Sequence, residues 1–301
     1  MNKPPEDPLM RHIWQDPPKV LYHYTGIDVL EKLTNKDVGN GKLWASDIRF
    51  LNDRSEYIEA RHFIKELLKE RTANDRALRK KVLSDLKSPE RVESQSDVFV
   101  ASFSSNGDSL PQWRGYCSIG SGVSIGFRSS SLLGSVLEVD DEVFKEDDDG
   151  GISRGLMKCA YTDNEKRNIL SQQLDSYISI ARGTHPYLKP NRSRTILSSV
   201  VDLCSPSFKH ESFKEEEEWR EVVDCQYPQI PKRHFRPGLS TLVPYITLDV
   251  AAKNPSKYIS HVFIAPTPHE ELARMAVEKL LRSRGLDGVK VENSANPYRS
   301  W

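Results

Sequence analysis

The sequence predicts an α+β fold in which a β-sheet is flanked by helices. Segments with the two-residue alternation of strands and segments with helical spacing follow one another without regular β-α-β alternation, which disfavours a doubly wound sheet. The chain contains no internal repeat, so a solenoid or propeller is not expected. Its 301 residues are enough to bury a large core, and we expect one domain over residues 19–301.

The N-terminal part is expected to begin with an unstructured arm. Residues 1–18 are rich in proline and charge, and such sequence buries too little surface to order itself. Residues 20–25 are predicted to form the first strand. A helix follows, with Asp28 as its cap, and residues 42–46 return as a second strand after the turn at Gly41.

The middle of the chain combines long helices with short strands. Apolar spacing predicts a helix over residues 55–86 with a break near 72–75, and we interpret residues 55–95 as a helical insertion. Further elements are expected in this part: a strand over 97–104, a short helix over 110–116 that Pro111 opens, and a strand over 122–127.

The C-terminal part is predicted to complete the sheet. An acidic surface loop is expected over residues 140–151, and a second helical insertion over 163–205, with helices at 165–181 and 193–204. The remaining elements are strands at 218–225, 242–248, 258–264 and 289–292 and a helix at 270–283. Ser294, Pro297, Tyr298 and Arg299 are expected to pack back on the domain, with Trp301 adding apolar area.

Composition excludes several classes of protein. Lysine plus arginine equals aspartate plus glutamate, 43 against 43, so no global positive field holds nucleic acid, although a local basic strip is compatible with this balance. The four cysteines form no CxxC pair, which argues against a zinc site or a disulfide framework. The sequence has no signal peptide and no apolar run long enough to span a bilayer, so we expect a cytoplasmic protein without membrane contact.

The common catalytic signatures are missing. There is no GxxxxGK[ST], no strand-linked GxGxxG, no GxSxG and no HExxH, which disfavours phosphate-binding loops, α/β-hydrolases and metalloproteases. No set of Asp, Glu, His and Lys has metal-ligand spacing, so no metal is expected and a nuclease effector has little support.

The first strand carries His23 and Thr25 two residues apart, and such residues point to one face of a strand. Two hydrogen-bonding side chains on one face can hold the ribose of a nucleotide. The alternative is a buried histidine that satisfies a neighbouring carbonyl.

Trp113 and Tyr116 lie on the short helix after the third strand, where an aromatic ring could stack on a flat heterocycle. The alternative is that both rings belong to the core. Later in the chain, four adjacent glutamates lead into a strand, so Glu216 and Glu218 would share one face at its start. A carboxylate there can bind a ribose hydroxyl and stabilise a positive charge at an anomeric carbon. A solvated charge run is the other interpretation.

Taken together, the motifs resemble those of a known family. The string YHYT, LWAS, FLND, SFS, WRGY, GVSIGF, EEEWR, LVPYI and PYR looks like an uncharacterised bacterial family of domains of unknown function, over about residues 20–299. A more distant resemblance is to the ADP-ribosyltransferase superfamily, in particular DNA-modifying toxins and the poly-ADP-ribose polymerase-like branch with a His-Tyr-Glu pattern.

This second resemblance implies an ADP-ribosyltransferase-like fold, with a split, mixed β-sheet flanked by helices, and a set of roles. His23 and Thr25 would hold the nicotinamide-side ribose and amide of NAD, Tyr116 would stack on nicotinamide, and Glu218 or Glu216 would be catalytic. Ser46 and Arg49 would add contacts to the cofactor. Arg49, with Asn52 and Asp53 just after it, would hold phosphate or orient the acceptor.

The expected function is therefore that of an NAD-dependent ADP-ribosyltransferase acting as a bacterial toxin or an antiviral defence effector. Its acceptor would be a nucleic acid or a protein, and an antitoxin or defence-system protein would be a partner. The alternative from another class is a non-catalytic module that senses a nucleotide or binds a protein. The sequence leaves the acceptor open.

Overall fold

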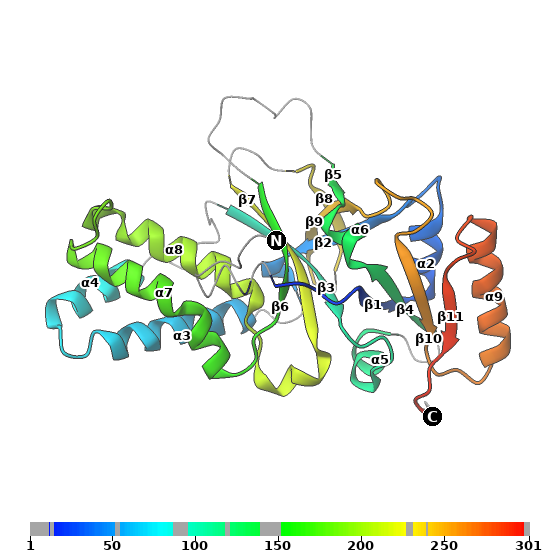
Figure 1. Ribbon diagram of the computed structural model, residues 1–301, viewed down its shortest axis with the longest axis horizontal. Coiled ribbons are helices and arrows are strands. Elements are labelled where there is room, and N and C mark those ends of the chain that lie inside the picture. The colour runs from blue at the N-terminus through cyan, green and yellow to red at the C-terminus, as the bar shows by residue number, and fades with distance from the viewer. Residues whose placement is uncertain are drawn as a thin grey trace.

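The computed structural model describes residue 12 and residues 15–51, 55–86, 96–117, 121–138, 152–226, 231–238 and 240–297. These residues form a mixed α+β structure in which one open sheet runs through the middle of the molecule (Figure 1). The strands are β1 (Val20–Gly26), β2 (Lys42–Asp47), β3 (Ser96–Ser104), β4 (Gly122–Arg128), β5 (Val136–Leu137), β6 (Ile152–Lys158), β7 (Glu218–Gln226), β8 (His234–Pro237), β9 (Leu242–Asp249), β10 (Ile259–Ile264) and β11 (Lys290–Asn293).

Helices flank this sheet. The α-helices are α2 (Ile27–Thr34), α3 (Ser55–Arg71), α4 (Arg76–Leu86), α5 (Leu110–Tyr116), α6 (Ser129–Leu133), α7 (Asp163–Arg182), α8 (Ser193–Cys204) and α9 (Glu270–Ser283). Short 3-10 helices are η1 (Ile48–Phe50), η2 (Pro190–Arg192), η3 (Ser205–Ser207) and η4 (Glu211–Glu216).

The strand order is β11-β10-β4-β1-β3-β2-β9-β5, with β7 as a further neighbour of β3, β6 paired to β7 and β8 paired to β9. All these pairs are antiparallel except β10 with β11. Strand β3 holds the sheet together. One of its edges pairs with β7 along its whole length, whereas the other pairs with β2 at Phe99 and Val100 and with β1 at Ser104. The sheet is therefore split where β1 and β2 diverge from this shared edge.

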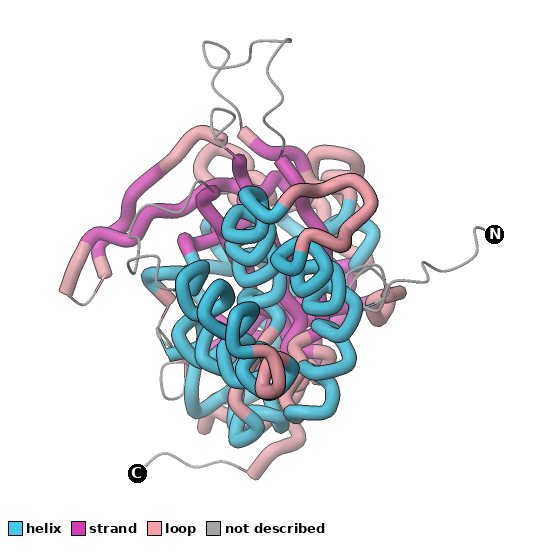
Figure 2. The backbone as a smooth tube through the Cα atoms, turned by 90° about the vertical axis from the view of Figure 1, so that its left-hand side faces the viewer, coloured by secondary structure: helices cyan, strands magenta, loops and turns pink. Residues whose placement is uncertain are grey.

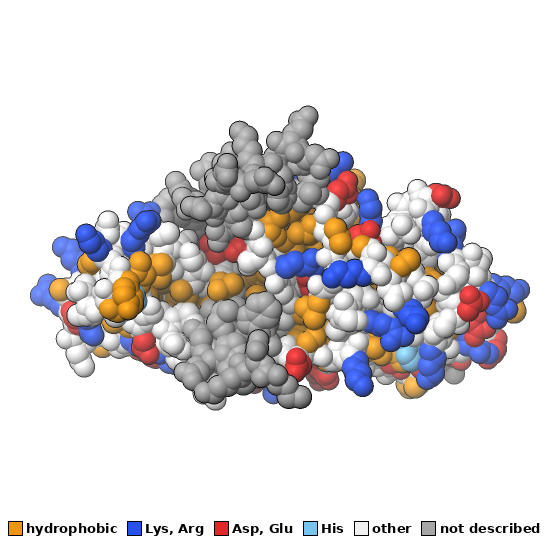
Figure 3. All heavy atoms as spheres, turned by 45° about the horizontal axis from the view of Figure 1, so that its top comes forward, with side chains coloured by type: hydrophobic (Ala, Val, Ile, Leu, Met, Phe, Trp, Pro, Cys, Tyr) orange, Lys and Arg blue, Asp and Glu red, His pale blue; other side chains and the backbone are white. Residues whose placement is uncertain are grey.

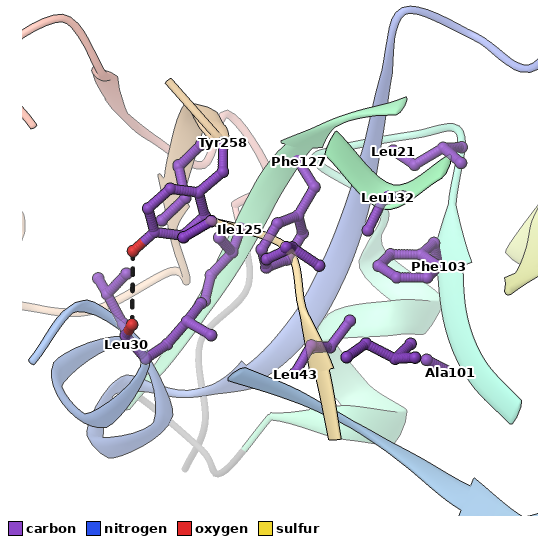
Figure 4. Packing of buried hydrophobic residues seen from close by; sticks show 14 of the residues in the cluster. Leu21, Leu30, Leu43, Ala101, Phe103, Ile125, Phe127, Leu132 and Tyr258 are labelled. Carbon is purple, nitrogen blue, oxygen red and sulfur yellow. Dashed lines mark hydrogen bonds between the residues drawn. The ribbon is translucent and has the colours of Figure 1, made fainter. Parts of the chain in front are cut away.

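The main core lies on one face of the sheet. The strand predicted over residues 97–104 is confirmed as β3. Its side chains alternate, because Phe99, Ala101 and Phe103 are buried in this core whereas Val98 and Val100 join a separate apolar cluster on the other face. Figure 4 shows the core side chains of β1, β2, β3 and β4 converging with Leu132 of α6 and with Leu30 of α2. We call the face that points away from this core the outer face.

Helices α3, α4, α7 and α8 pack on one another around a second apolar cluster and form a layer at one end of the sheet (Figure 1). Figure 2 looks onto this layer, with the sheet behind it. Helix α9 lies at the opposite end with α2, and its Val277 and Leu281 enter the main core. Helix α5 covers β1 on the outer face, where Trp113 packs edge-on against Tyr24.

Several predictions of single elements are wrong or incomplete. Strand β6 was not expected, because its sequence lacks the alternation of a strand and it is ordered by pairing with β7. Gly26, not Asp28, is the N-cap of α2, and Asp28 lies in its first turn. The predicted loop over 140–151 lies outside the described residues, as does most of the N-terminal arm.

Of the residues predicted to pack back on the domain, Ser294 does so, and its neighbours Ala295 and Asn296 do so as well. Asp108 accepts hydrogen bonds from Ser294 Oγ (2.5 Å), the Ala295 amide (2.8 Å) and Asn296 Nδ2 (2.8 Å). Its carboxylate also accepts from Trp113 Nε1 at 2.7 Å, so one side chain ties the C-terminal segment to α5. Pro297 is exposed, and Tyr298, Arg299 and Trp301 lie outside the described residues.

Candidate functional site

The glutamate run turns sharply before it enters β7. Glu216 ends η4, Glu217 adopts the left-handed conformation with φ of 45°, and Glu218 begins the strand. The two candidate carboxylates meet at Lys209, whose Nζ donates to Glu216 Oε2 at 2.5 Å and to Glu218 Oε2 at 2.6 Å. They therefore lie on one side as predicted, although a turn and not strand alternation brings them there.

Glu218 is enclosed by cations. Arg220 donates from Nε to Oε1 at 2.7 Å and from Nη2 to Oε2 at 3.0 Å, and all three of Glu218, Lys209 and Arg220 are buried. Burial opposes ionisation of this carboxyl group, but Arg220 and Lys209 outweigh it and hold the pKa of Glu218 at about 2. Burial opposes the charge on the Lys209 ammonium group, but Glu218 together with Tyr116 and Glu216 outweighs it and raises the pKa of Lys209. Glu218 is thus a carboxylate with both oxygens engaged.

Tyr116 reaches the same cluster from α5. Its hydroxyl lies 3.5 Å from Glu216 Oε2, and 47% of the residue is exposed. Burial of the hydroxyl, together with Glu216 and Glu218, raises the pKa of Tyr116 to about 12 although Lys209 opposes the shift, so the phenol is neutral at pH 7. The structure therefore brings together Tyr116, Glu216 and Glu218, while Trp113 is a core residue, as its alternative interpretation predicts. We call Tyr116, Lys209, Glu216, Glu218 and Arg220 the β7 charge cluster.

His23 does not join this cluster. Tyr22 is paired with Ser104, and Ser104 is paired with Glu218, so these three side chains share the outer face. His23 follows Tyr22 and points to the other face, where its ring meets Phe103 edge-on. The expectation that His23 and Glu218 line one cleft is therefore wrong.

The contacts of His23 match its second interpretation. Nδ1 lies 2.9 Å from the Ser102 carbonyl, which only accepts, so Nδ1 carries the proton. Burial lowers the pKa of His23, with the Ser102 bond opposing, and this favours the neutral imidazole. The predicted NAD-contacting residues consequently do not form one site in the arrangement that the resemblance implies.

The other predicted cofactor residues lie apart from the β7 charge cluster as well. Thr25 pairs with Val123 in the β1–β4 ladder. Ser46 is buried on β2 and accepts a hydrogen bond from Arg236 at 3.3 Å. Arg49 is held by Asp47 (2.5 Å) and Asp97 (2.6 Å), an arrangement that fixes η1 against β3. Asn52 and Asp53 lie outside the described residues.

A pocket of about 390 Å³ adjoins the β7 charge cluster at Lys209. Its walls come from α3, the start of α7 and the segment 208–210, so it lies where the helical layer meets the outer face of the sheet. Two phenyl rings, Phe63 and Phe208, form part of the wall and pack edge to face with centroids 6.1 Å apart. Sequence reasoning missed this pocket, because α3 and α7 are about 100 residues apart and no local pattern pairs them.

The polar lining of the pocket is mixed but has more cations than anions. The lining side chains that carry or can carry positive charge are His62, Lys166, Arg167, Lys209 and His210, and the acidic ones are Glu66 and Asp163. Lys166 Nζ lies 5.8 Å from the centre of the Phe63 ring and 6.0 Å from that of Phe208. Glu66 is paired with Lys69 at 2.6 Å, and Arg167 is paired with Glu70 at 2.7 Å. This lining suits an anion that carries an aromatic group.

The described residues contain no cluster of three or more His, Cys, Asp or Glu side chains that could hold a metal ion. None of their helices combines the length and apolar character that crossing a membrane requires.

Comparison with known proteins gives one match. No curated protein and no solved structure matches the chain, and nothing in the comparisons supports the resemblance to ADP-ribosyltransferases. The matching segment, residues 112–221, includes Tyr116, Lys209, Glu216, Glu218 and Arg220, and thus the whole β7 charge cluster. The model that matches it is described as Protein of unknown function (DUF2971), which supports the predicted relation to an uncharacterised family.

Proposed function

We propose that this chain is a nucleotide-binding module whose ligand lies in the pocket between α3, α7 and the segment 208–210. The observation that carries the proposal is the wall itself, in which two phenyl rings stand beside lysine and arginine side chains. A nucleotide presents a flat base and a phosphate group, and such a wall offers aromatic packing for the first and positive charge for the second. The volume of about 390 Å³ lies within the range of small-molecule sites.

The position of Lys209 supports a sensing role. This lysine lines the pocket and at the same time binds Glu216 and Glu218. A phosphate in the pocket would attract its ammonium group and compete with Glu216, the more exposed of the two carboxylates at 13% against 4% of the side chain. Because Glu216 also contacts Tyr116, binding in the pocket would change the contacts of α5.

Calorimetric titration with ATP, ADP, NAD⁺ and pyrophosphate tests the proposal. We expect a nucleotide to bind more tightly than pyrophosphate, and Lys166→Gln to weaken that binding by roughly 10- to 150-fold, since one charge-assisted contact contributes on the order of 1.5–3 kcal/mol. Lys279→Gln, an exposed lysine on α9, is the matched control and should have no effect. Absence of nucleotide binding at millimolar concentration, or equal affinities in the two variants, would refute the proposal.

ADP-ribosyl transfer from NAD⁺ is a second proposal, together with the toxin or defence role and the macromolecular acceptor that it implies. The observation in its favour is that Tyr116, Glu216 and Glu218 converge from separate elements. The position of His23 and the enclosed carboxylate of Glu218 speak against the His-Tyr-Glu arrangement. Of the two glutamates, Glu216 is the one that a ligand can reach.

Nicotinamide release from NAD⁺ tests this second proposal. If transfer occurs, Glu216→Gln should lower the rate by about 10²- to 10³-fold, the loss typical of a group that stabilises transition-state charge. Glu215→Gln, the exposed neighbour, should retain the rate. No nicotinamide release by the wild type with protein, RNA and DNA acceptors present would eliminate transfer and leave the binding module.

A further inference from the structure

Three rings form a column on the outer face of the sheet, away from the β7 charge cluster and its pocket. Tyr245 of β9 stacks on His234 of β8 with ring centroids 5.4 Å apart and an interplanar angle of 27°. Trp44 of β2 lies against Tyr245 at 4.5 Å and 30°. Tyr245 pairs directly with His234 and with Ser46, so the column crosses three adjacent strands on one face.

This column is accessible because of its place in the sheet. On the opposite face, Leu43, Ala45 and Ile246 fill the main core, so alternation turns Trp44 and Tyr245 outward. Strand β2 pairs with β3 only at Ser46 and Asp47. Strand β3 therefore does not extend alongside β2 as far as Trp44. Trp44 is 49% exposed, which is high for the largest apolar side chain.

Cations surround the column. Arg236 reaches Ser46 from β8 at 3.3 Å, and the described residues offer it no carboxylate. Two lysines are also near the column, Lys42 and Lys232, and both are paired with Glu138. Three arginine and lysine side chains thus face one carboxylate, whereas Asp47 and Asp97, which bind Arg49 and Arg233, lie on the core side of the sheet. In Figure 3, apolar and positively charged side chains adjoin in the middle of the face shown.

We propose that this column binds single-stranded nucleic acid, with one unpaired base stacked on the open face of Trp44 and a neighbouring phosphate bound by Arg236. Aromatic side chains on a sheet surface with adjacent arginines are the means by which proteins bind single strands. A duplex cannot make this contact with Trp44, because the faces of its bases are covered by the neighbouring base pairs. The net positive charge of the patch is small, so the binding relies on stacking more than on phosphate contacts. This inference uses a different surface from the proposed nucleotide pocket and does not depend on it.

Fluorescence anisotropy with labelled 12-nucleotide oligouridylate, oligothymidylate and a 12-base-pair duplex tests the proposal. We expect both single strands to bind and the duplex to bind at least tenfold more weakly. Trp44→Ala should weaken single-strand binding by roughly 5- to 100-fold, the range for loss of one stacked base. Trp44→Phe, which keeps an aromatic face, should restore most of it.

Matched controls separate this site from non-specific binding. Tyr187→Ala removes an aromatic residue that is 89% exposed elsewhere and should have no effect. Arg236→Gln should reduce the slope of log affinity against log salt by about 1, whereas Arg282→Gln on α9 should leave it unchanged. Unequal affinity for the two single strands would show which combination of sugar and base is preferred, and either order supports the proposal.

Three results would overturn the proposal. These are no binding of either single strand at 50 mM salt, equal binding of the duplex, and equal losses in Trp44→Ala and Tyr187→Ala. Circular dichroism of each variant shows whether its fold is retained. If Trp44→Ala fails to fold, the Trp44→Phe and Arg236→Gln measurements still decide, because both keep the packing of the strand.

Discussion

The two faces of β7 each bury a glutamate, and the two carboxyl groups are held in opposite ways. Glu218 faces outward and receives hydrogen bonds from Lys209 and Arg220 on both oxygens. Glu221 faces the main core, where Arg154 donates to Oε1 at 2.6 Å and 3.0 Å while Oε2 has no partner among the described residues. Both residues are almost fully buried, at 3% and 0% exposure.

This difference in partners reverses the direction of the pKa shift. Two cations outweigh burial at Glu218 and lower its pKa to about 2. At Glu221, burial outweighs the single cation Arg154, and the pKa is raised. Depth alone therefore does not determine the charge state of a buried carboxyl group. The number of cations and of satisfied oxygen atoms decides it.

The largest effect is expected for Glu218→Gln. The substitution leaves Lys209 and Arg220 buried with less compensation, and breaking a buried ion pair in this way costs about 3–5 kcal/mol. The free energy of unfolding, measured by urea titration at pH 7, should fall by that amount. Glu215→Gln, at the exposed neighbour, should change it by less than about 0.5 kcal/mol. If Glu218→Gln lowered the free energy of unfolding by less than about 1 kcal/mol, the ion pairs of Glu218 with Lys209 and Arg220 would have to be solvated.

Acid should remove the same stabilisation. Because the pKa of Glu218 in the folded protein is about 2, below the ~4.3 of an unfolded glutamate, the contribution is complete above pH ~4.3 and is lost as the pH falls toward 2. A shift of this size corresponds to about 3 kcal/mol. Other carboxyl groups with lowered pKa, such as Glu138, also titrate here, so the test compares the wild type with Glu218→Gln at pH 7, 4.5 and 3. If the free energy of unfolding changed with pH in the same way in both proteins, the lowered pKa of Glu218 would be contradicted.

Local pattern predicted most of the elements but not how they pair. The alternation in residues 97–104 and the helical spacing in 270–283 are properties of neighbouring residues, and β3 and α9 follow them closely. Which residue of β1 lies opposite which residue of β3 is a long-range choice. The pairing of Tyr22 with Ser104 places His23 on the face opposite Glu218, and no pattern within either strand encodes this pairing.

The candidate site was predicted in part for the same reason. Glu216, Glu218 and Tyr116 stood out because each is a polar group at the end of an element. Lys209 did not, because it follows the 3-10 turn η3 in a segment without periodicity, and its role arises only when η4 folds back to bring both glutamates to it. Arg220 carried a weak signal, as the basic residue after four glutamates and a tryptophan.

A smaller effect is expected for Tyr161→Phe, which sharpens the comparison on the outer face. The Tyr161 hydroxyl accepts a hydrogen bond from the Glu218 amide at 2.7 Å, and both groups are buried. Without the hydroxyl the amide has no acceptor, and an unsatisfied buried donor costs about 1–3 kcal/mol. Urea titration measures the loss. A water molecule that replaces the hydroxyl would reduce the loss below this range and show that the cluster is open to solvent.

The smallest effect is expected for Glu221→Gln, and this variant is the sharpest test of the comparison. Glutamine keeps the shape and an acceptor oxygen for Arg154, which also donates to Ser135 and to the Leu132 carbonyl. Burial disfavours the charged form of Glu221, as its raised pKa indicates. Because the substitution removes this disfavoured charge, the free energy of unfolding at pH 7 should fall by no more than about 1 kcal/mol. The pH dependence has the opposite sign from that of Glu218. With a pKa above its unfolded value, Glu221 lowers stability as the pH rises from ~4.3 through the folded pKa, and Glu221→Gln should abolish this decline. A loss as large as that of Glu218→Gln would show that Arg154 stabilises Glu221 as fully as two cations stabilise Glu218, and the contrast between the faces would fail.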